Sequence, residues 1–394
     1  MNIAVEGCCH GELDKIYETI LAHEQQTGIK VDLLLCCGDF QAVRDESDLK
    51  ELICPLKYKA QKDFKQYYNG KKVAPVLTIF IGGNHEAPDL LRHLYYGGWV
   101  APNIYYLGYS GIVNIAGLRI AGISGIYNQN NYTKGYYEQR PYSEDAKRSA
   151  YNVREFDVEK LYMIENELDI FMSHDWPAGI EHYGNLEALL RVKPYFVSDV
   201  RHNILGNPKT RKLLEKLQPT FWFSGHLHVK YEAKYKHEDG STTHFLALDK
   251  VLPNRQFLKI MDVKPKRLAE GAKRKRNGDY TLEKVLCYDR EWCAILVANR
   301  DRMPLNAFPS TTPITLNKPT EEDFRFVDEQ FAKFGFEALS IGTLDRVYKM
   351  PSWDVNDYKN PKLQREKFQD MLNLPDNSFF NPNINTKYRV VRRE

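Results

Sequence analysis

The chain has 394 residues and a mass of 45.9 kDa, about the length of two domains. Its 43% hydrophobic and 27% charged residues are typical of a globular protein and exclude a disordered or fibrous one. The 55 basic and 52 acidic residues leave a net charge of +3. This charge is too small to coat nucleic acid over the whole surface, so any basic partner surface must be local.

Hydropathy and cysteine usage indicate a soluble intracellular protein without a membrane partner. Mean hydropathy is −0.53, and the longest apolar runs, such as residues 76–81, are far shorter than the roughly 20 residues that cross a bilayer. The chain begins with Glu6 and Glu12 and no basic stretch, so we expect no signal peptide. The seven cysteines include the adjacent pairs Cys8–Cys9 and Cys36–Cys37, which favours buried, reduced thiols over a disulfide framework.

Apolar runs alternate with amphipathic stretches over the first ~260 residues, which is typical of an α/β fold. In chain order the pattern predicts strands over residues 2–6, 33–37, 76–81, 118–123, 168–172, 220–223, 244–248 and 257–261. It predicts helices over residues 13–26, 48–67, 87–96, 156–167 and 208–217. Beyond them, residues 281–299 and helical patterns over 321–334 and 361–372 favour a smaller, mainly helical C-terminal domain.

Two stretches interrupt this alternation. Residues 124–154 form a long polar segment without clear periodicity, and such segments inside compact domains are usually functional or disordered. Residues 264–276 carry seven basic side chains against the single acid Glu270, which is typical of a solvated linker between domains.

Five short motifs each follow the end of a strand-like run. In open α/β sheets, ligands bind beyond the carboxyl ends of the strands, so the five motifs are expected to converge on one site. They are Cys8-Cys9-His10-Gly11, Gly38-Asp39, Asn84-His85-Glu86, His174-Asp175 and His226-Leu227-His228.

The residue types of these motifs indicate a centre with two metal ions. Imidazole binds zinc, iron and manganese, a carboxylate can bridge two cations, and an Asn carbonyl adds a neutral oxygen ligand. If the backbone is extended, the spacing of two places Cys8 and His10, and likewise His226 and His228, on one side, with Cys9 turned into the core. A two-metal site can hold a phosphodiester between its cations.

The five motifs together resemble the calcineurin-like metallophosphoesterase superfamily, whose pattern is Asp-x-His, Gly-Asp, Gly-Asn-His-Asp/Glu, a lone His and Gly-His-x-His. The resemblance implies an α/β/β/α architecture, in which helices flank a β-sandwich. It also implies that Asp39 bridges two metals and that His85 donates a proton to the leaving group. One metal site would comprise Cys8, His10 and His228, and the other Asn84, His174 and His226.

Cys8 stands where that superfamily has Asp, and the lariat RNA debranching enzymes carry the same substitution. The chain is similar to this family in GDFQAVR (38–44), SHDWP (173–177), FLALDKVLP (245–253) and the long segment 205–230. The resemblance implies a catalytic domain over residues 1–262 that includes a lariat recognition insertion over 124–154. It further implies a basic linker over 263–280 and a C-terminal debranching-enzyme domain over 281–394.

The implied reaction is hydrolysis of the 2′–5′ phosphodiester at the branch point of lariat RNA by a metal-activated hydroxide, with His85 as general acid. Thiolate is a soft ligand, so Cys8 favours Fe(II) or Zn(II), with Mn(II) also permitted, over Mg(II). We expect two sites, the weaker one beside Cys8. Glu86 either orients His85 or caps the helix that follows.

The insertion combines aromatic and basic residues, which suit stacking on unpaired bases and contacts with phosphates. A Tyr-rich loop that packs on its own protein is the alternative. The predicted RNA-contacting residues are Tyr127, Asn130, Tyr132, Lys134, Tyr136, Tyr137, Arg140, Tyr142, Arg148, Tyr151 and Arg154.

Other expectations concern the context of the reaction. The basic run at 264–276 is either a plain linker or a nuclear-import signal, so we expect a nuclear protein that also occurs in the cytoplasm. We expect a monomer whose partner is branched RNA. Two rival functions remain: a phosphoesterase or nuclease for another phosphodiester, and a metal-depleted scaffold. Against phosphoprotein phosphatases, Gly38-Asp39 continues as Phe40-Gln41 and not as Arg-Gly.

Overall fold

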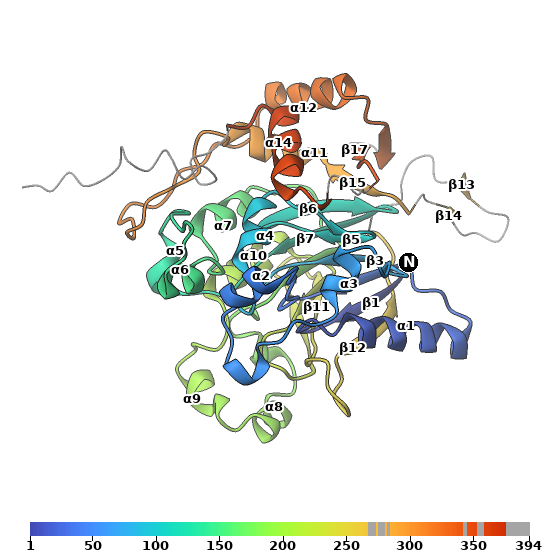
Figure 1. Cartoon of the computed structure of the whole chain (residues 1–394), viewed down its shortest axis with the longest axis vertical. Coiled ribbons are helices and arrows are strands. Elements are labelled where there is room, and N and C mark those ends of the chain that lie inside the picture. The colour runs from blue at the N-terminus through green and yellow to red at the C-terminus, as the bar shows by residue number, and fades with distance from the viewer. Residues whose placement is uncertain (267–272, 275–279, 282–283, 342–344, 353–357, 376–394) are drawn as a thin grey trace, which may run out of the picture.

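The computed structural model describes residues 1–266, 273–274, 280–281, 284–341, 345–352 and 358–375 (Figure 1). Within them two β-sheets face each other and helices cover the outer faces. The six-stranded sheet has the order β12-β1-β2-β3-β5-β4, and the nine-stranded sheet has the order β10-β11-β9-β8-β7-β6-β15-β17-β16. This arrangement confirms the predicted α/β/β/α sandwich.

The strands of the six-stranded sheet are β1 (Asn2–Glu6), β2 (Leu33–Cys36), β3 (Leu77–Phe80), β4 (Gly98–Ala101), β5 (Ile104–Tyr106) and β12 (Leu258–Asp262). Those of the nine-stranded sheet are β6 (Ser110–Ile115), β7 (Leu118–Ile123), β8 (Ile170–Ser173), β9 (Phe221–Ser224), β10 (Tyr231–Lys236), β11 (Thr242–Ala247), β15 (Leu286–Asp289), β16 (Ala338–Ile341) and β17 (Asp345–Lys349). A separate pair comprises β13 (Lys273–Arg274) and β14 (Tyr280–Thr281).

The helices are α1 (Leu13–Thr27), α2 (Glu46–Glu51), α3 (Phe64–Tyr68), α4 (Pro88–His93), α5 (Gln129–Tyr132), α6 (Glu144–Ser149), α7 (Glu155–Tyr162), α8 (Leu186–Val192), α9 (Phe196–Arg201), α10 (Pro208–Leu217), α11 (Arg290–Ala298), α12 (Glu321–Lys333) and α14 (Pro361–Leu372). Two short 3₁₀ helices are η1 (Leu56–Tyr58) and η2 (Ile180–Tyr183).

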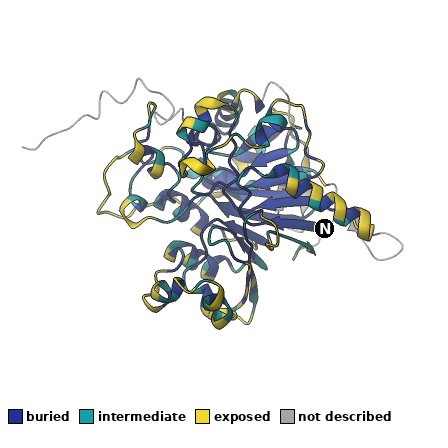
Figure 2. Cartoon of the chain, turned by 60° about the horizontal axis from the view of Figure 1, so that its bottom comes forward, coloured by how far each residue is buried: buried dark blue, intermediate teal, exposed yellow. Residues whose placement is uncertain are grey.

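The alternation of side chains along β1 builds the layers. Ile3 and Val5 join the buried cluster between the two sheets, whereas Ala4 packs in a second cluster with Leu13 and Ile16 of α1. Because successive strand residues point to opposite faces, both faces of this strand must be apolar. The colouring by burial shows strands buried in the centre and exposed residues on the outer helices (Figure 2).

Most predicted elements of the first 260 residues are present, but the helix predicted over 48–67 is wrong. The chain forms α2, η1 and α3 there. Pro55 lies between α2 and η1, where it lacks a backbone N–H and disfavours the helical conformation of the residue before it. The strands β4, β5, β6 and β10 were not predicted, although β10 alternates buried and exposed residues.

The C-terminal region contains the predicted helices α12 and α14, and it also adds three strands to the nine-stranded sheet. β15 pairs antiparallel with β6 on one side and with β17 on the other. The division into domains at 263–280 stays a prediction, and most of that linker lies outside the described residues. Among the described helices, none has the length and apolar character needed to cross a membrane.

Candidate active site

The predicted site residues follow strands that end at the same edge of their sheets. β1, β2 and β3 run parallel in one sheet, and β8, β9 and β11 run parallel in the other. Carboxyl ends of parallel strands share an edge, and ligands bind there. The five motifs follow β1, β2, β3, β8 and β9, and the structure brings them together as the sequence predicts.

Four of the predicted metal ligands form one compact cluster. The candidate ligand atoms of Cys8, His10, Asp39 and His228 all lie within 4.8 Å of one another. His10 and His228 point Nε2 at Nε2 across 3.2 Å, and His10 Nε2 is 3.6 Å from Asp39 Oδ2. Cys8 Sγ accepts a hydrogen bond of 2.9 Å from the backbone N–H of His226.

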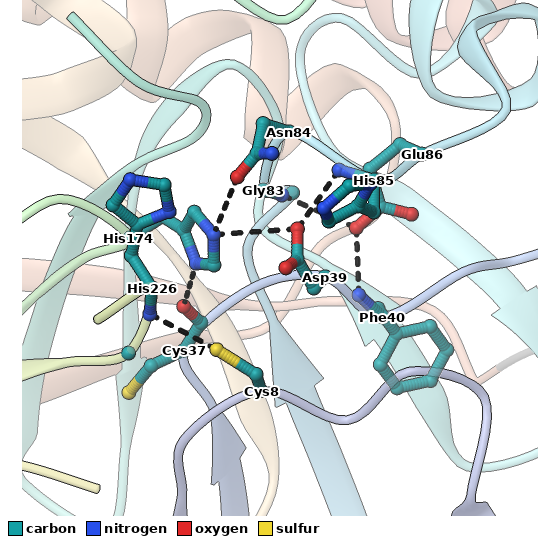
Figure 3. A network of polar contacts seen from close by, with 12 residues as sticks. Cys8, Cys37, Asp39, Phe40, Gly83, Asn84, His85, Glu86, His174 and His226 are labelled. Atoms are coloured by element: carbon teal, nitrogen blue, oxygen red, sulfur yellow. Dashed lines mark hydrogen bonds and ion pairs between the residues drawn. The ribbon is translucent and has the colours of Figure 1, made fainter. Parts of the chain in front are cut away.

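The remaining predicted ligands, Asn84, His174 and His226, lie beside Asp39 (Figure 3). His174 Nε2 is 3.3 Å from Asp39 Oδ1 and 3.2 Å from Asn84 Oδ1. Its Nδ1 donates to the carbonyl oxygen of Cys37 at 2.7 Å, which leaves Nε2 to face the site. The ring centroid of His226 is 4.9 Å from that of His174, and its Nε2 is 3.5 Å from Asp175 Oδ1.

The backbone of the ligand loops is not extended. His10, Asp39, His226 and His228 have φ values of 47°, 48°, 63° and 49°, in the left-handed region that non-glycine residues seldom adopt. The extended backbone predicted for these residues is therefore wrong, and tight left-handed turns bring the side chains together. Such strained positions persist where the surrounding structure holds them, as at functional sites.

Two glycines make room for this packing. A Cβ on Gly83 would lie 2.2 Å from Asp39 Oδ1 and 2.7 Å from His174 Nε2. A Cβ on Gly38, whose φ is 110°, would lie 2.2 Å from His174 Nδ1. Neither role was predicted from the sequence. The signal was present, because each glycine directly precedes a predicted ligand in Gly38-Asp39 and Gly83-Asn84.

Charge is concentrated on Asp39 and His174. Burial alone would raise the pKa of Asp39, yet contact with His174 and the nearby His10 holds it well below its usual value. Burial likewise opposes protonation of His174, but the Asp39 carboxylate raises its pKa to about 9. Burial lowers the pKa of His10 to about 4 and that of His228 to about 3, so both imidazoles are neutral at pH 7.

This donor set fits two divalent cations. Asp39 Oδ2 is buried and has no hydrogen-bond partner within the part of the chain that the structure describes, an arrangement that a bound cation would compensate. His10 faces Oδ2 and His174 faces Oδ1 of the same carboxylate, and Asn84 contributes an oxygen. Burial and Asp39 raise the pKa of the Cys8 thiol well above its usual value, so Cys8 needs a cation nearby to become a thiolate ligand.

His85, the predicted proton donor, lies beside the ligands and is fixed at two atoms. Its backbone N–H donates to Asp39 Oδ1 at 2.8 Å, and its ring centroid is 5.7 Å from that of His10. Its Nδ1 donates to the carbonyl oxygen of Ile53 at 2.8 Å. Nε2 is thereby left for a proton that could pass to a substrate.

Glu86 has a role that neither sequence interpretation described. Its carboxylate accepts hydrogen bonds from the backbone N–H groups of Phe40, Gln41 and Gly83 at 2.7, 2.8 and 3.2 Å. It makes no side-chain cap at the start of α4. Glu86 therefore fixes the two loops that carry Asp39 and Asn84.

The predicted RNA-contacting residues divide by exposure. Tyr132, Tyr136 and Arg154 are 4%, 3% and 1% exposed, so for them the prediction of RNA contact is wrong. Tyr136 donates its hydroxyl to the buried Asp157, and Arg154 pairs with Glu138 at 2.6 Å. Aromatic and basic side chains here build the inside of the segment, as the self-packing alternative expected.

The other eight predicted residues of the insertion keep some exposure: Tyr127, Asn130, Lys134, Tyr137, Arg140, Tyr142, Arg148 and Tyr151. The Arg140 guanidinium forms ion pairs with Glu51 and Asp89, at 3.1 and 3.2 Å. Tyr151 lies near the metal ligands: it lines a cavity with Gly83, and the Asp39 carboxylate adds to the effect of burial in raising the pKa of Tyr151.

Two family models match the chain. The model of the calcineurin-like phosphoesterases covers residues 1–230, which include all five motifs. The model of the C-terminal domain of lariat debranching enzymes covers residues 240–377. The described part of that second region supplies β15, β16 and β17 of the nine-stranded sheet.

Curated relatives carry the same family name. The chain is 49% identical to lariat debranching enzyme A of Xenopus laevis over 334 residues, which are 84% of this chain and 60% of that protein. It is 51% identical to the lariat debranching enzyme of Arabidopsis thaliana, over 75% of this chain and 68% of that protein. The match to the Drosophila melanogaster enzyme is 41% identical over 96% of this chain and 77% of that protein.

The share of each relative that is covered varies. The alignments span 60% of the Xenopus laevis protein and 51% of the Danio rerio protein, so the chain matches little more than half the length of these relatives. The family model covers more than half of this chain, and two of the relatives are matched over more than two thirds of their own length. The chain therefore belongs to the calcineurin-like phosphoesterases and, among them, to the lariat debranching enzymes.

Proposed function

We propose that this chain hydrolyses the 2′–5′ phosphodiester at the branch point of lariat RNA. The observation that carries the proposal is the convergence of Asp39, the other predicted ligands and His85 at one sheet edge, in a chain whose family relatives are named as debranching enzymes. The site offers ligands on both sides of a single carboxylate, which suits a clamp on one phosphate group.

The protein's own groups have separate tasks in this reaction. Asp39 holds the two halves of the ligand set together, and Gly38 and Gly83 allow its close approach to His174. His85 delivers the proton from Nε2 to the departing 2′ oxygen, since its Nδ1 is held by Ile53. Two bound divalent cations would supply a nucleophilic water at neutral pH and neutralise charge on the phosphate oxygens.

We propose Fe(II) or Zn(II), with Mn(II) as an alternative, for the two cations. The site of Asp39, Asn84, His174 and His226 is the tighter one, because its four side chains supply oxygen and nitrogen ligands without any contribution from the thiol. The site beside Cys8 is weaker, because the buried thiol must lose a proton first. Metal analysis after stepwise chelation tests this order. We expect one ion to be removed before the other, and removal of both ions at the same chelator concentration would contradict the order.

We propose that the RNA lies over Tyr151 and Arg148. Arg148 is exposed and makes no ion pair with another described residue, and its charge acts on Tyr151, which lies near Asp39. Tyr137, half-buried beneath the Lys134 ammonium at 5.6 Å, offers a further ring. Arg140 contributes to this surface only if it gives up its two carboxylate partners.

The decisive assay compares a branched RNA containing one 2′–5′ bond with a linear 3′–5′ RNA of the same sequence. We expect metal-loaded protein to cut the branched RNA at the branch and to leave the linear one intact. Equal cleavage of both would favour a general phosphodiesterase, and binding without cleavage would favour a scaffold. His85→Ala is the matched variant, because it removes the proton donor and no ligand.

We propose a nuclear location, on the basis of the basic residues at 264–276. The run carries seven basic residues against one acid, and most of it lies outside the described residues. Microscopy of a fluorescent fusion, with Lys273–Arg276 either intact or replaced by Gln, tests the proposal. Nuclear accumulation that survives the replacement would remove the role assigned to the run. The monomeric state stays a prediction.

A further inference from the structure

A sixth strand ends at the same edge as the five that carry the motifs. β11 runs parallel to β9, and the chain continues from it through Leu248 and Asp249 to Lys250. This end packs tightly against the loop that holds Cys8: a Cβ on Gly7 would lie 2.4 Å from the Asp249 oxygen and 2.5 Å from the Leu248 oxygen. The segment therefore borders the metal-ligand cluster directly.

The backbone pairing sets the direction of the Lys250 side chain. Lys250 forms an isolated parallel bridge with Cys8. Residues paired across neighbouring strands send their side chains to the same face of a sheet. Cys8 points its Sγ at His10, Asp39 and His228, so Lys250 leaves the backbone on the face of these ligands. Its charge also adds to burial in lowering the pKa of His10 and His228.

The Lys250 ammonium has no counter-ion in the described part of the chain. Its neighbour Asp249 is engaged elsewhere, because Oδ2 faces Arg255 at 3.3 Å and Oδ1 accepts from the backbone N–H of Lys250. By contrast, Lys259 of β12 contacts Glu232 at 2.8 Å. A half-buried cation without a carboxylate partner, beside the metal-ligand cluster, is placed to bind an anion from outside.

We propose that Lys250 binds a non-bridging oxygen of the scissile phosphodiester, on the side of the site formed by Cys8, His10 and His228. The inference rests on the proposed phosphodiester hydrolysis and deepens it. The ammonium binds the phosphate in the ground state, and this interaction becomes stronger as negative charge grows on the phosphate oxygens during attack. Lys250 thereby places a positive charge beside the cluster of Cys8, His10 and His228.

The test compares Lys250→Met, Lys250→Arg and the control Lys259→Met in metal-loaded protein. We expect Lys250→Met to lower kcat/KM by about 10- to 100-fold, through a lower kcat and a higher KM, because a charged hydrogen bond is lost. Metal content should stay at the wild-type level. Lys250→Arg should recover most of the activity, and Lys259→Met should match wild type.

A second readout uses binding alone. In a His85→Ala background, which binds but does not cut, the affinity for branched RNA is measured against salt concentration. Removing one phosphate contact should reduce the slope of log affinity against log salt by about 0.7 to 0.9. An unchanged slope together with unchanged kcat/KM would overturn the proposal, and so would activity lost in proportion to lost metal.

The small diester bis(4-nitrophenyl) phosphate separates this inference from the proposed function. Suppose that the wild type cuts this diester but not branched RNA, and that Lys250→Met lowers cleavage of the diester. The role of Lys250 is then supported, and the proposal of a lariat substrate is contradicted. If the wild type cuts branched RNA and Lys250→Met equals Lys259→Met in every readout, the substrate holds and the role of Lys250 is overturned.

Discussion

The metal centre and the RNA-binding role of the insertion at 124–154 were both predicted from residue types. The structure brings the predicted residues together in the first region but buries some of them in the second. Each predicted ligand reaches the edge where its strand ends, and Asp39 lies among them. In the insertion, Tyr136 and Arg154 turn inward and pair with Asp157 and Glu138. A strand end fixes where a residue lies, whereas composition in an irregular segment does not fix which side chains reach solvent.

The largest expected effect is at the centre itself. Asp39→Asn keeps the size of the side chain but removes the charge that both ligand groups share, so we expect loss of metal and a fall in activity of at least about a thousandfold. Metal analysis and cleavage of branched RNA measure both effects. Full metal content in the variant would mean that the two groups bind independently of Asp39.

His85→Ala should separate chemistry from binding. Because the His85 ring donates to Ile53 and the residue contacts Asp39 through its backbone N–H, metal content and RNA affinity should stay near wild type while kcat falls by about a hundred- to ten-thousandfold. His202→Ala, at the exposed end of α9, is the control and should change neither. Loss of metal from His85→Ala would make it a ligand and remove it as the proton donor.

Arg154→Met and Arg148→Met test two different roles within the insertion, a structural one and an RNA-binding one. Arg154→Met leaves the buried Glu138 carboxylate without its 2.6 Å partner, which should lower the free energy of unfolding by about 3–5 kcal/mol. Arg148→Met removes an exposed charge and should weaken RNA binding with little effect on unfolding. Denaturant titration and RNA binding of both variants distinguish the two roles. Equal stabilities would show that Arg154 is not structural.

Tyr151→Ala should give the smallest effect. Loss of one stacking platform is worth about 1–3 kcal/mol, so the affinity for branched RNA should fall about 5- to 150-fold. Tyr162→Ala, an exposed tyrosine on α7, serves as the control. A change in kcat that exceeds the change in affinity would place Tyr151 in the chemical step, since it lies near Asp39.

These comparisons show what the sequence could predict and what it could not. Alternating apolar runs located β1, β7 and α10 with their observed bounds, because pattern and burial agree there. The motifs predicted where the candidate ligands gather, since each stands just beyond such a run. The turn geometry escaped prediction: the left-handed backbone at His10 and His226 depends on packing between loops that are distant in the sequence.

Contacts between distant segments also explain the missed roles. Glu86 fixes the backbone 45 and 46 residues earlier, at Gln41 and Phe40, and no local pattern encodes that distance. Lys250 enters the site through a bridge to Cys8 on a neighbouring strand end. The pairing of β15 with β6 likewise joins segments far apart, so residues 286–289 could not be assigned to the sheet from their own sequence.

The most direct test of the shared centre is anomalous diffraction from crystals saturated with Mn(II) without oxygen. We expect two peaks that both contact the Asp39 carboxylate, one also near Asn84 and His174, the other, weaker, near Cys8 and His10. A single peak at saturation, or ions bound away from Asp39, would rule out a centre shared through Asp39.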